Sequence, residues 1–354
     1  MRIAFLTSTP LEIAGGSGTF AGVATLARAL RGLGVQVRIL APGIQLPIYT
    51  ARRLWFNEQL RSRQWTDCDL IVGFDMDGYR IAGRTGLPHV ASIKGVIADE
   101  MRFERGLTRL TMSIQARCEA AHVRRADLVM TTSRYAARQL QQLYGIRETP
   151  SIVPELIDLA GWRELFARHA AEPAPGKFTV LSVCRFYPRK RLHLLLRAAE
   201  RLRTEIPGLE FRIVGDGPER VKLQAVSHAR RLENTVTWLG DLSQGELVRE
   251  YDRCDLFCLP SVQEGFGIVF LEAMAAGKPI LAARAGAVPE VVEQGLLVDP
   301  DSEEALADGI RRLYRDPDLR SSLAAAGQSI VERYDASKVA AMFLAAVEGA
   351  RRAS

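Results

Sequence analysis

The sequence predicts an α/β protein built from two Rossmann-like, doubly wound parallel-sheet domains. Short apolar segments alternate with helical segments up to residue 144, and the alternation restarts at residue 178 after a stretch without strong pattern. Two segments, ADLVMTTS (126–133) and CDLFCLPS (254–261), repeat an acid–leucine start, an apolar strand and a final serine. Such alternation is typical of parallel sheets with helices on both faces. A chain of 354 residues is also long for a single core.

The first half of the chain, residues 1–155, predicts one such domain. RIAFLTS at residues 2–8 is typical of a buried parallel strand, and a helix follows from about Thr19 to Arg31 with its apolar residues on one face. The further predicted strands are 35–40, 69–75, 89–93 and 127–133, and the further predicted helices lie near 51–64, 99–124 and 134–144.

Residues 156–333 predict a second domain of the same kind. Its predicted strands are 178–183, 210–215, 235–240, 255–260, 279–283 and 295–300, with helices at 190–204, 218–231 and 243–251 and after residues 267, 302 and 317. A last helix, 334–354, is expected to pack back on the first domain. Ligands of such folds lie outside the carboxyl ends of the strands, so a cleft between two facing sheets is the expected active site.

The composition is that of a globular protein, with 47% hydrophobic and 25% charged residues. No apolar run approaches the ~18–20 residues of a membrane span, and the amino-terminal residues lack the pattern of a signal peptide. We therefore expect a cytoplasmic protein. The cysteines are scattered and odd in number, which predicts buried free thiols: Cys68, Cys118, Cys184, Cys254 and Cys258.

The charge is uneven along the chain. Residues 1–154 hold 20 Lys and Arg against 12 Asp and Glu (+8), whereas residues 155–354 hold 27 against 29 (−2). A basic first half suits a phosphate-rich substrate, an anionic glycan or a membrane surface, although arginines spread over solvated helices give the same balance. The basic segment 102–125 can in the same way lie against anionic lipid or be a solvated helix flank. Nucleic acid is not expected, because the basic residues are not interleaved with aromatic ones.

A glycine-rich loop follows the first strand and includes Gly15 and Gly16. It is a candidate phosphate-binding turn, and Gly16, Gly18 and Ala21 fit the dinucleotide-binding pattern G-x-G-x-x-G/A. The fit is weak, because the glycines lie several residues past the strand and the second strand carries Arg38 where an acid would hold a ribose. A dinucleotide-dependent oxidoreductase that uses these residues is an alternative function.

The segment SVQEGFGIVFLEAMAAGK (261–278) carries two acids, Glu264 and Glu272, around the small residues Gly265 and Gly267. After Gly267 the apolar residues recur at helical spacing, which predicts a helix N-terminus whose free N–H groups and dipole attract an anion. Backbone N–H groups that bind a phosphate, together with carboxylates that bind hydroxyl groups, would hold a phosphorylated sugar. An ordinary buried turn and helix is the alternative.

Two cations follow the first strand of the second domain, Arg185 directly and Lys190 at the start of the next helix. They can neutralise a pyrophosphate leaving group. The alternative is a basic helix start in water, which is unfavourable beside the helix dipole. The turn at Gly215 also ends a strand and is a candidate nucleotide-side loop or a plain turn.

Asp75 and Asp77 lie at the carboxyl end of a predicted strand and can touch an acceptor or serve the structure alone. No group of histidines has the spacing of metal ligands, and none is paired with a serine or cysteine nucleophile. We expect no bound metal.

Taken together, these motifs resemble family-four retaining glycosyltransferases, which have the GT-B fold. The stretch from Glu264 to Pro279 resembles their E-x7-E signature. The resemblance covers nearly the whole chain, and its other parts are the Gly15–Gly16 loop, ADLVMTTSRYAARQLQQLYGI (126–146), Arg185 with Lys190, GDGPE (215–219), WLGDL (238–242) and AVPEVV (287–292).

The resemblance implies a role for each matching residue. Glu264 would bond hydroxyls of the donor sugar and Glu272 those of the ribose, while Arg185 and Lys190 would carry the diphosphate with the amides of the helix start. The residues implied to bind the donor are Gly15, Gly16, Gly215, Gly265, Phe266, Gly267, Ile268 and Glu272. Members of the family are generally metal-independent.

The chain departs from the family pattern in its first half, at its hinge and beside Arg185 and Lys190. Lys94 stands where the family often has a histidine, and it would serve as a cation in that place. The hinge Pro-Asn-Gly-Val-Asp is here Pro154-Glu155-Leu156-Ile157-Asp158, and Cys184 and Arg191 replace glycines beside Arg185 and Lys190.

The resemblance implies a retaining hexosyltransferase that uses a UDP- or GDP-sugar donor and no cofactor. Its acceptor would be a glycan, a lipid-linked molecule or a small molecule. The basic charge of the first domain, and not the resemblance, leaves open a peripheral contact with a membrane. A nucleotide-sugar epimerase of the same architecture and a non-catalytic sugar-nucleotide sensor are the alternatives.

Overall fold

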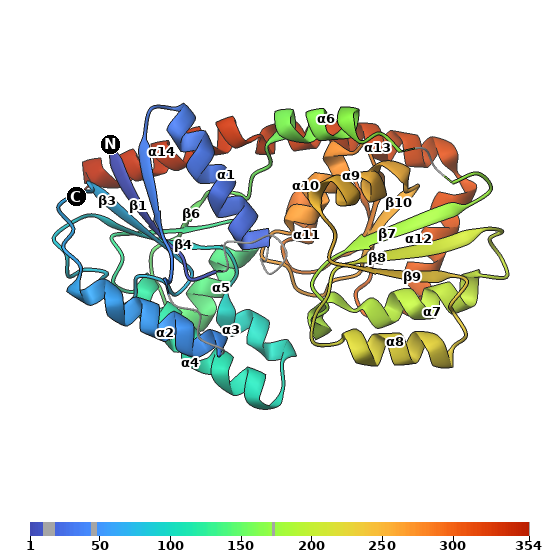
Figure 1. The fold of residues 1–354 in the computed structure, drawn as a ribbon, viewed down its shortest axis with the longest axis horizontal. Helices are drawn as coiled ribbons and strands as arrows, with labels where there is room; N and C mark the ends of the chain where they lie inside the picture. The colour runs from blue at the N-terminus through green and yellow to red at the C-terminus, as the bar shows by residue number, and fades with distance from the viewer. Residues whose placement is uncertain (10–17, 44–47, 172–173, 354) are drawn as a thin grey trace. The chain divides into compact units, whose positions relative to one another are not determined.

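The computed structural model describes residues 1–9, 18–43, 48–171 and 174–353. The chain forms two compact units, one of residues 1–156 with 336–354 and one of residues 157–335. In each unit helices cover both faces of a six-stranded parallel sheet (Figure 1). The predicted fold class, two doubly wound parallel sheets, is confirmed. The boundaries between the two units, after residues 156 and 335, lie close to the domain boundaries expected after residues 155 and 333.

The sheet of the first unit has the strand order β2-β1-β3-β4-β5-β6, and every neighbouring pair is parallel. Side chains alternate between its two faces, as the period of a strand requires. Its elements are β1 (Arg2–Leu6), α1 (Gly18–Gly32), β2 (Gln36–Leu40), α2 (Tyr49–Gln59), η1 (Leu60–Ser62), β3 (Leu70–Phe74), β4 (His89–Ile93), α3 (Ile97–Glu100), η2 (Met101–Phe103), α4 (Gly106–Val123), β5 (Leu128–Thr131), α5 (Arg134–Tyr144), β6 (Ser151–Ile152) and α14 (Ala336–Ala353).

The last helix of the chain, α14, completes the core of this unit by packing against α1. Its Phe343 ring meets the Phe5 ring edge to face, with centroids 6.2 Å apart. Val339 and Val347 lie in the same buried cluster. The opposite face of the sheet is covered by α3, α4 and α5, whose apolar side chains pack on Ala91 and Ile93 of β4.

The second unit has the strand order β12-β11-β10-β7-β8-β9, again all parallel. The strands β7, β10 and β11 are wholly buried and mainly apolar, as expected for a parallel sheet covered on both faces, whereas β9 and β12 are partly exposed. Its elements are α6 (Leu159–Arg168), β7 (Phe178–Val183), η3 (Pro188–Lys190), α7 (Leu192–Leu202), β8 (Leu209–Val214), α8 (Arg220–Ala229), β9 (Val236–Gly240), α9 (Gln244–Arg253), β10 (Leu256–Leu259), α10 (Ile268–Ala275), β11 (Ile280–Ala283), α11 (Val288–Val291), β12 (Leu296–Val298), α12 (Glu303–Arg315), α13 (Pro317–Val331) and η4 (Glu332–Tyr334).

The structure differs from the expected elements in several places, and the short helix α11 is one element that the sequence does not predict. Helix α6 forms where no element was expected, and the Asp158 side chain caps it by accepting from the Gly161 N–H. The two-residue strand β6 lies in the expected gap and adds an edge strand. The helix expected at 99–124 is broken into α3, η2 and α4, and Gly106 at the break has φ +56°.

Candidate active site

The N-terminus of α10 is shaped by Gly267, which is its N-cap residue and has φ +92°. A side chain here would be strained, and a Cβ atom would lie 2.6 Å from the Phe270 ring. The helix begins at Ile268, and Phe270, Leu271 and Met274 anchor it in the core. Since no side chain caps this helix start, its backbone N–H groups form an anion-attracting site.

Phe266 contributes to this loop mainly through its backbone. Its ring is buried in the core and meets the Tyr334 ring edge to face, with centroids 5.4 Å apart. Gly265 lies between Glu264 and this anchored ring in a segment without regular secondary structure. The buried Phe266 ring therefore anchors this loop and positions Gly265 and Gly267 on either side of it.

Glu264 and Lys190 form an ion pair at this end of the sheet. The Lys190 Nζ donates to Glu264 Oε1 over 2.5 Å, and both side chains are largely buried. The Val262 N–H donates to the Arg189 carbonyl, so the two loops are also joined through their backbones. The Ala287 N–H donates to the Glu264 carbonyl. Contacts from two other loops therefore fix the backbone and the carboxylate of Glu264.

Arg185 follows β7 and is half-exposed. Its guanidinium lies 3.6 Å from the Asp241 carboxylate, which follows β9. An exposed pair of this length adds little stability, so the guanidinium is available to an anionic ligand. The Gly215 backbone, with φ +115°, packs so closely on this segment that a Cβ would lie 2.1 Å from the Cys184 carbonyl oxygen.

Glu272 lies on α10 and is partly buried. Its Oε2 accepts a hydrogen bond of 2.8 Å from the hydroxyl of Tyr251, a fully buried residue of α9. Burial raises the pKa of Glu272 to about 7, against the opposing effect of the Tyr251 hydrogen bond. The carboxyl group therefore titrates near neutral pH.

The residues predicted in the second half thus gather at one edge of one sheet. Strands β10, β7 and β8 are neighbours, and Glu264, Arg185 and Gly215 follow their carboxyl ends. Two cations, a helix N-terminus and two acids share this edge. Such a set can hold a diphosphate and hydrogen-bond the hydroxyls beside it.

In the first unit, Asp77 is wholly buried and its carboxylate is used by the protein itself. It accepts from the N–H and hydroxyl of Ser8, each at 2.6 Å, and from the Asn57 amide at 2.9 Å. The Arg53 guanidinium lies 3.5 Å away and is also buried. A carboxylate with no exposed surface cannot contact an acceptor, so Asp77 has a structural role.

Asp75 is placed differently, at the carboxyl end of β3 with part of its surface exposed. Its φ of +53° is unusual for a residue with a side chain. The Lys94 N–H donates to Asp75 Oδ1 over 2.9 Å. Burial raises the pKa of Asp75 to about 6, although the Arg53 charge and the Lys94 bond act against this rise. Backbone strain beside a titratable side chain is a frequent property of functional sites.

Lys94 is buried, and its Nζ lies 3.2 Å from Glu155 Oε2 within the same unit. The ammonium also lies over the Phe74 ring, 5.9 Å from its centroid. This pairing with Glu155, a residue of the divergent hinge, could not be read from the sequence. Gly15 and Gly16 fall outside the residues that the structure describes.

His89 and His122, whose sequence spacing does not indicate metal ligands, contact each other next to the backbone of Asp75. The Nε2 atoms of His89 and His122 lie 2.8 Å apart, and His122 Nδ1 lies 2.6 Å from the Asp75 carbonyl oxygen. Since a carbonyl only accepts, His122 Nδ1 carries the hydrogen and His122 Nε2 accepts from His89. Burial lowers the pKa of both rings. The neutral pair supports the strained backbone of Asp75.

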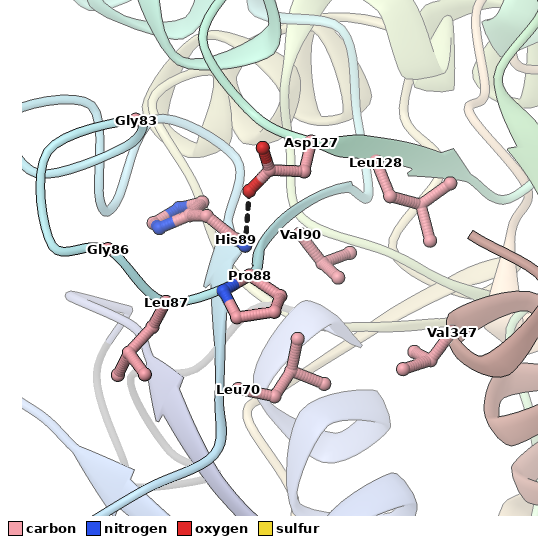
Figure 2. A pocket seen from close by; sticks show the side chains of 10 residues that line it. All are labelled: Leu70, Gly83, Gly86, Leu87, Pro88, His89, Val90, Asp127, Leu128 and Val347. Atoms are coloured by element: carbon pink, nitrogen blue, oxygen red, sulfur yellow. Dashed lines mark hydrogen bonds between the residues drawn. The ribbon is translucent and has the colours of Figure 1, made fainter. Parts of the chain in front are cut away.

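A cavity of about 410 Å³ lies at the amino ends of β3, β4 and β5 (Figure 2). Asp75 and Lys94 follow the opposite, carboxyl ends of β3 and β4. The Asp127 carboxylate on its wall accepts from the His89 N–H over 2.8 Å. The other lining residues are Leu70, Gly83, Gly86, Leu87, Pro88, Val90, Leu128 and Val347. An apolar wall whose one carboxylate is already bonded does not suit a phosphorylated ligand.

Neither a metal cluster nor a membrane-spanning helix is found among the described residues. Within those residues, no group of three or more His, Cys, Asp or Glu side chains is arranged to hold a metal ion. None of the helices described is both long and apolar enough to cross a membrane.

The chain matches two family models that together span most of its length. Residues 15–160 match the model described as Glycosyltransferase Family 4, and residues 166–330 match Glycosyl transferases group 1. The chain belongs to glycosyltransferase family 4. The edge that carries Glu264, Lys190 and Arg185 lies within the second match.

Curated proteins similar to this family 4 glycosyltransferase act on several substrates. A GDP-mannose-dependent α-(1-6)-phosphatidylinositol monomannoside mannosyltransferase of Mycobacterium tuberculosis is 32% identical over 222 residues, 58% of this chain and 57% of the relative. A D-inositol 3-phosphate glycosyltransferase of Nocardia farcinica is 33% identical over 239 residues, 60% of this chain and 53% of the relative. The matched region thus spans little more than half the length of each.

Solved structures of glycosyltransferases share the fold over the whole chain. The sucrose-phosphate synthase of Thermosynechococcus elongatus superposes with a TM-score of 0.83 at 22% identity, covering 100% of both chains. Anabaena HepE in complex with UDP and glucose has a TM-score of 0.74 at 20% identity, covering 99% of this chain and 100% of that one. This likeness establishes the GT-B fold of the glycosyltransferase.

Proposed function

We propose that the protein transfers a hexose-type sugar from a nucleoside diphosphate donor to an acceptor hydroxyl, with retention of anomeric configuration. The observation that carries the proposal is the Lys190–Glu264 ion pair beside the uncapped start of α10. A cation and free amides suit a diphosphate, and a carboxylate held next to them suits the hydroxyls of the attached sugar. Membership of family 4 supports the same reaction class.

Each residue of this edge has a proposed role. The diphosphate is bound by Lys190, Arg185 and the backbone N–H groups of Gly267 and Ile268. Gly215 has no side chain, so the backbone at this turn can approach the diphosphate closely. Glu264 bonds the donor sugar, and its pairing with Lys190 holds the carboxylate in one orientation. Glu272 accepts from the ribose hydroxyls. Gly265 and Phe266 complete the donor site through their backbones. The roles of Gly15 and Gly16, which lie outside the described residues, stay predictions from the resemblance.

The proposed chemistry is substitution on the same face of the sugar. The bond between the anomeric carbon and the diphosphate oxygen breaks, the acceptor oxygen bonds to that carbon, and the acceptor proton passes to the departing diphosphate. The negative charge that develops on the diphosphate is stabilised by Lys190, Arg185 and the helix amides. Because these groups supply the positive charge, we expect turnover without a metal ion or cofactor.

The acceptor is proposed to bind the first unit. Asp75, at the carboxyl end of β3, is the candidate for a contact with its hydroxyl groups, and Lys94 supports Asp75 through a backbone hydrogen bond. The acceptors named for the relatives, an inositol phosphate and a phosphatidylinositol mannoside, motivate trials with polyol, glycan and lipid-linked acceptors. We propose that the reaction takes place in the cytoplasm.

A calorimetric panel of UDP, GDP, ADP and their sugars tests the donor site first. We expect one nucleoside diphosphate and its sugar to bind, and Lys190→Ala and Glu264→Ala to reduce turnover by orders of magnitude with the fold intact. Lys222→Ala is the matched control, because Lys222 is exposed and pairs only with Glu219 among the described residues. Product NMR then distinguishes retention from inversion and transfer from epimerisation. Indifference to every nucleotide, or near-normal turnover of both site variants, contradicts the proposal.

A further inference from the structure

Helix α4 of the first unit carries apolar residues on two faces, and the core covers only one of them. Ala116, Ala120 and Val123 are buried against the sheet. On the outer face Leu107, Leu110 and Ile114 recur at helical spacing and are 74%, 60% and 39% exposed. Isolated exposed apolar residues are common on protein surfaces, but three on one helical stripe form a patch that signals an interaction.

Arginines surround this stripe. Arg105, Arg109 and Arg117 are exposed, and in the part of the chain that the structure describes none of them lies within ion-pair distance of an acid. Within the segment 102–117, Glu104 is the single acid, and it is buried. Arg102 pairs with Asp99. The patch is therefore apolar in its centre and positively charged at its border.

This combination fits the surface of an anionic lipid bilayer. Leucine and isoleucine side chains can enter the boundary between headgroups and acyl chains, while arginines reach the phosphates with their long side chains. Arginines next to a membrane surface gain from its negative potential. A second copy of this chain would bring the same unpaired arginines against one another, which disfavours self-association through this face.

We propose that the outer face of α4, formed by Leu107, Leu110, Ile114, Arg105, Arg109 and Arg117, docks on anionic lipid bilayers. This attachment goes beyond the proposed glycosyl transfer and does not depend on it. The helix follows β4 through α3 and η2, so the chain enters it from the strand end that carries Lys94. If the proposed function holds, a lipid-linked acceptor would be met on the side of the unit where Asp75 lies.

Vesicle cosedimentation of the full chain, without donor or acceptor, tests the proposal. Vesicles of phosphatidylcholine alone are compared with vesicles that also contain phosphatidylglycerol. We expect binding to the anionic vesicles only, and weakening by salt because the arginines contribute through charge. Leu107→Ser with Leu110→Ser should weaken binding at least tenfold, and Arg105→Glu with Arg109→Glu should do the same.

Matched controls come from exposed residues elsewhere. Val221→Ser changes an apolar residue of α8 that is 80% exposed, and Arg84→Glu reverses an exposed charge of the first unit. Both should bind as the unchanged protein does. Because the changed residues of α4 are exposed, all variants should keep their unfolding temperature and their affinity for soluble nucleotide, which separates loss of docking from loss of the donor site.

Three results would overturn the proposal. The first is equal binding of the leucine variant and the unchanged protein to anionic vesicles. The second is equal binding to neutral and anionic vesicles. The third is a self-association, measured by sedimentation velocity, that the leucine substitutions abolish while vesicle binding stays the same, which would assign the patch to a second copy of the chain.

Discussion

The hydroxyl of Tyr251 donates to Glu272 Oε2 over 2.8 Å and fixes the orientation of the carboxyl group that is proposed to hold the ribose. Tyr251 itself is immobilised in the core, where its ring stacks on Phe257 and meets Trp162 edge to face. The position of Glu272 on α10 is thus controlled from the neighbouring helix α9. Tyr251 is a positioning residue, since it acts on a ligand only through Glu272.

Donor affinity should rise with pH through neutrality. The pKa of Glu272 is about 7, and only the ionised carboxylate accepts from two ribose hydroxyls. Affinity for a nucleoside diphosphate sugar, whose diphosphate does not titrate in this range, should therefore increase about tenfold between pH 6 and pH 8. Calorimetry across this range measures the change.

Two variants identify the titrating group in that experiment. Glu272→Gln should bind with an affinity that is weaker and independent of pH. Tyr251→Phe should move the midpoint to higher pH, because the hydrogen bond that lowers the pKa of Glu272 is lost. An unchanged midpoint in Tyr251→Phe would rule out the positioning role.

Asp77 and Asp75 should separate in their effects on stability and activity. Asp77→Ala leaves the buried Arg53 and Asn57 without their shared partner and should cost about 3–5 kcal/mol of the free energy of unfolding. Asp67→Ala is the control, because Asp67 is exposed and pairs with the exposed Arg38 and the partly exposed Arg63, so its loss should cost less than about 1 kcal/mol. Asp75→Asn should keep the stability and lower the affinity for acceptor. Urea unfolding measures the first two effects, and equal stability of the Asp77 and Asp67 variants would contradict them.

The His89–His122 pair should make the first unit sensitive to acid. The folded state keeps both rings neutral, whereas the unfolded chain takes up protons below about pH 6.5. Their contribution to stability is therefore complete above pH 6.5 and is lost as the pH falls toward 4, the approximate pKa of His122. Between pH 8 and pH 5.5 the unchanged protein should lose roughly 1–2 kcal/mol more than His122→Gln.

Two comparisons make the histidine experiment specific. The variant retains Asp75 and Glu119, whose raised pKa values act in the opposite direction, so the difference between the two proteins isolates the histidines. His228→Gln removes an exposed histidine and should follow the unchanged protein. Parallel pH profiles for His122→Gln and the unchanged protein would show that the pair does not carry the effect.

Elements with strong local signals were predictable from the sequence. Helix α5 begins and ends where its pattern indicates, because Ser133 caps the first turn and Gly145 takes the left-handed conformation after the last. The start of α10 was predictable for the same reason, since Gly267 follows a loop and precedes a helical apolar pattern. The sequence does not predict helix α6, although Asp158 caps it, because its segment lies in the connection between the two domains.

The parts of the site that were missed are pairings between residues far apart in the chain. Glu264 and Glu272 lie in one short segment, so the sequence places them on one loop and helix. Tyr251 with Glu272 and Lys94 with Glu155 meet only because their elements pack together. A local sequence pattern does not predict contacts between residues that are far apart in the chain.

The first unit is discontinuous in sequence, since its core includes Phe343 and Val339 from α14. The second unit, in contrast, is one continuous stretch, and the chain enters and leaves it at paired residues, Ile157 and Asp335. During synthesis the second unit can therefore fold while the first still exposes the apolar surface around Phe5. We expect the part translated first to finish folding last, and a nascent chain at that stage to be a ready target for chaperones.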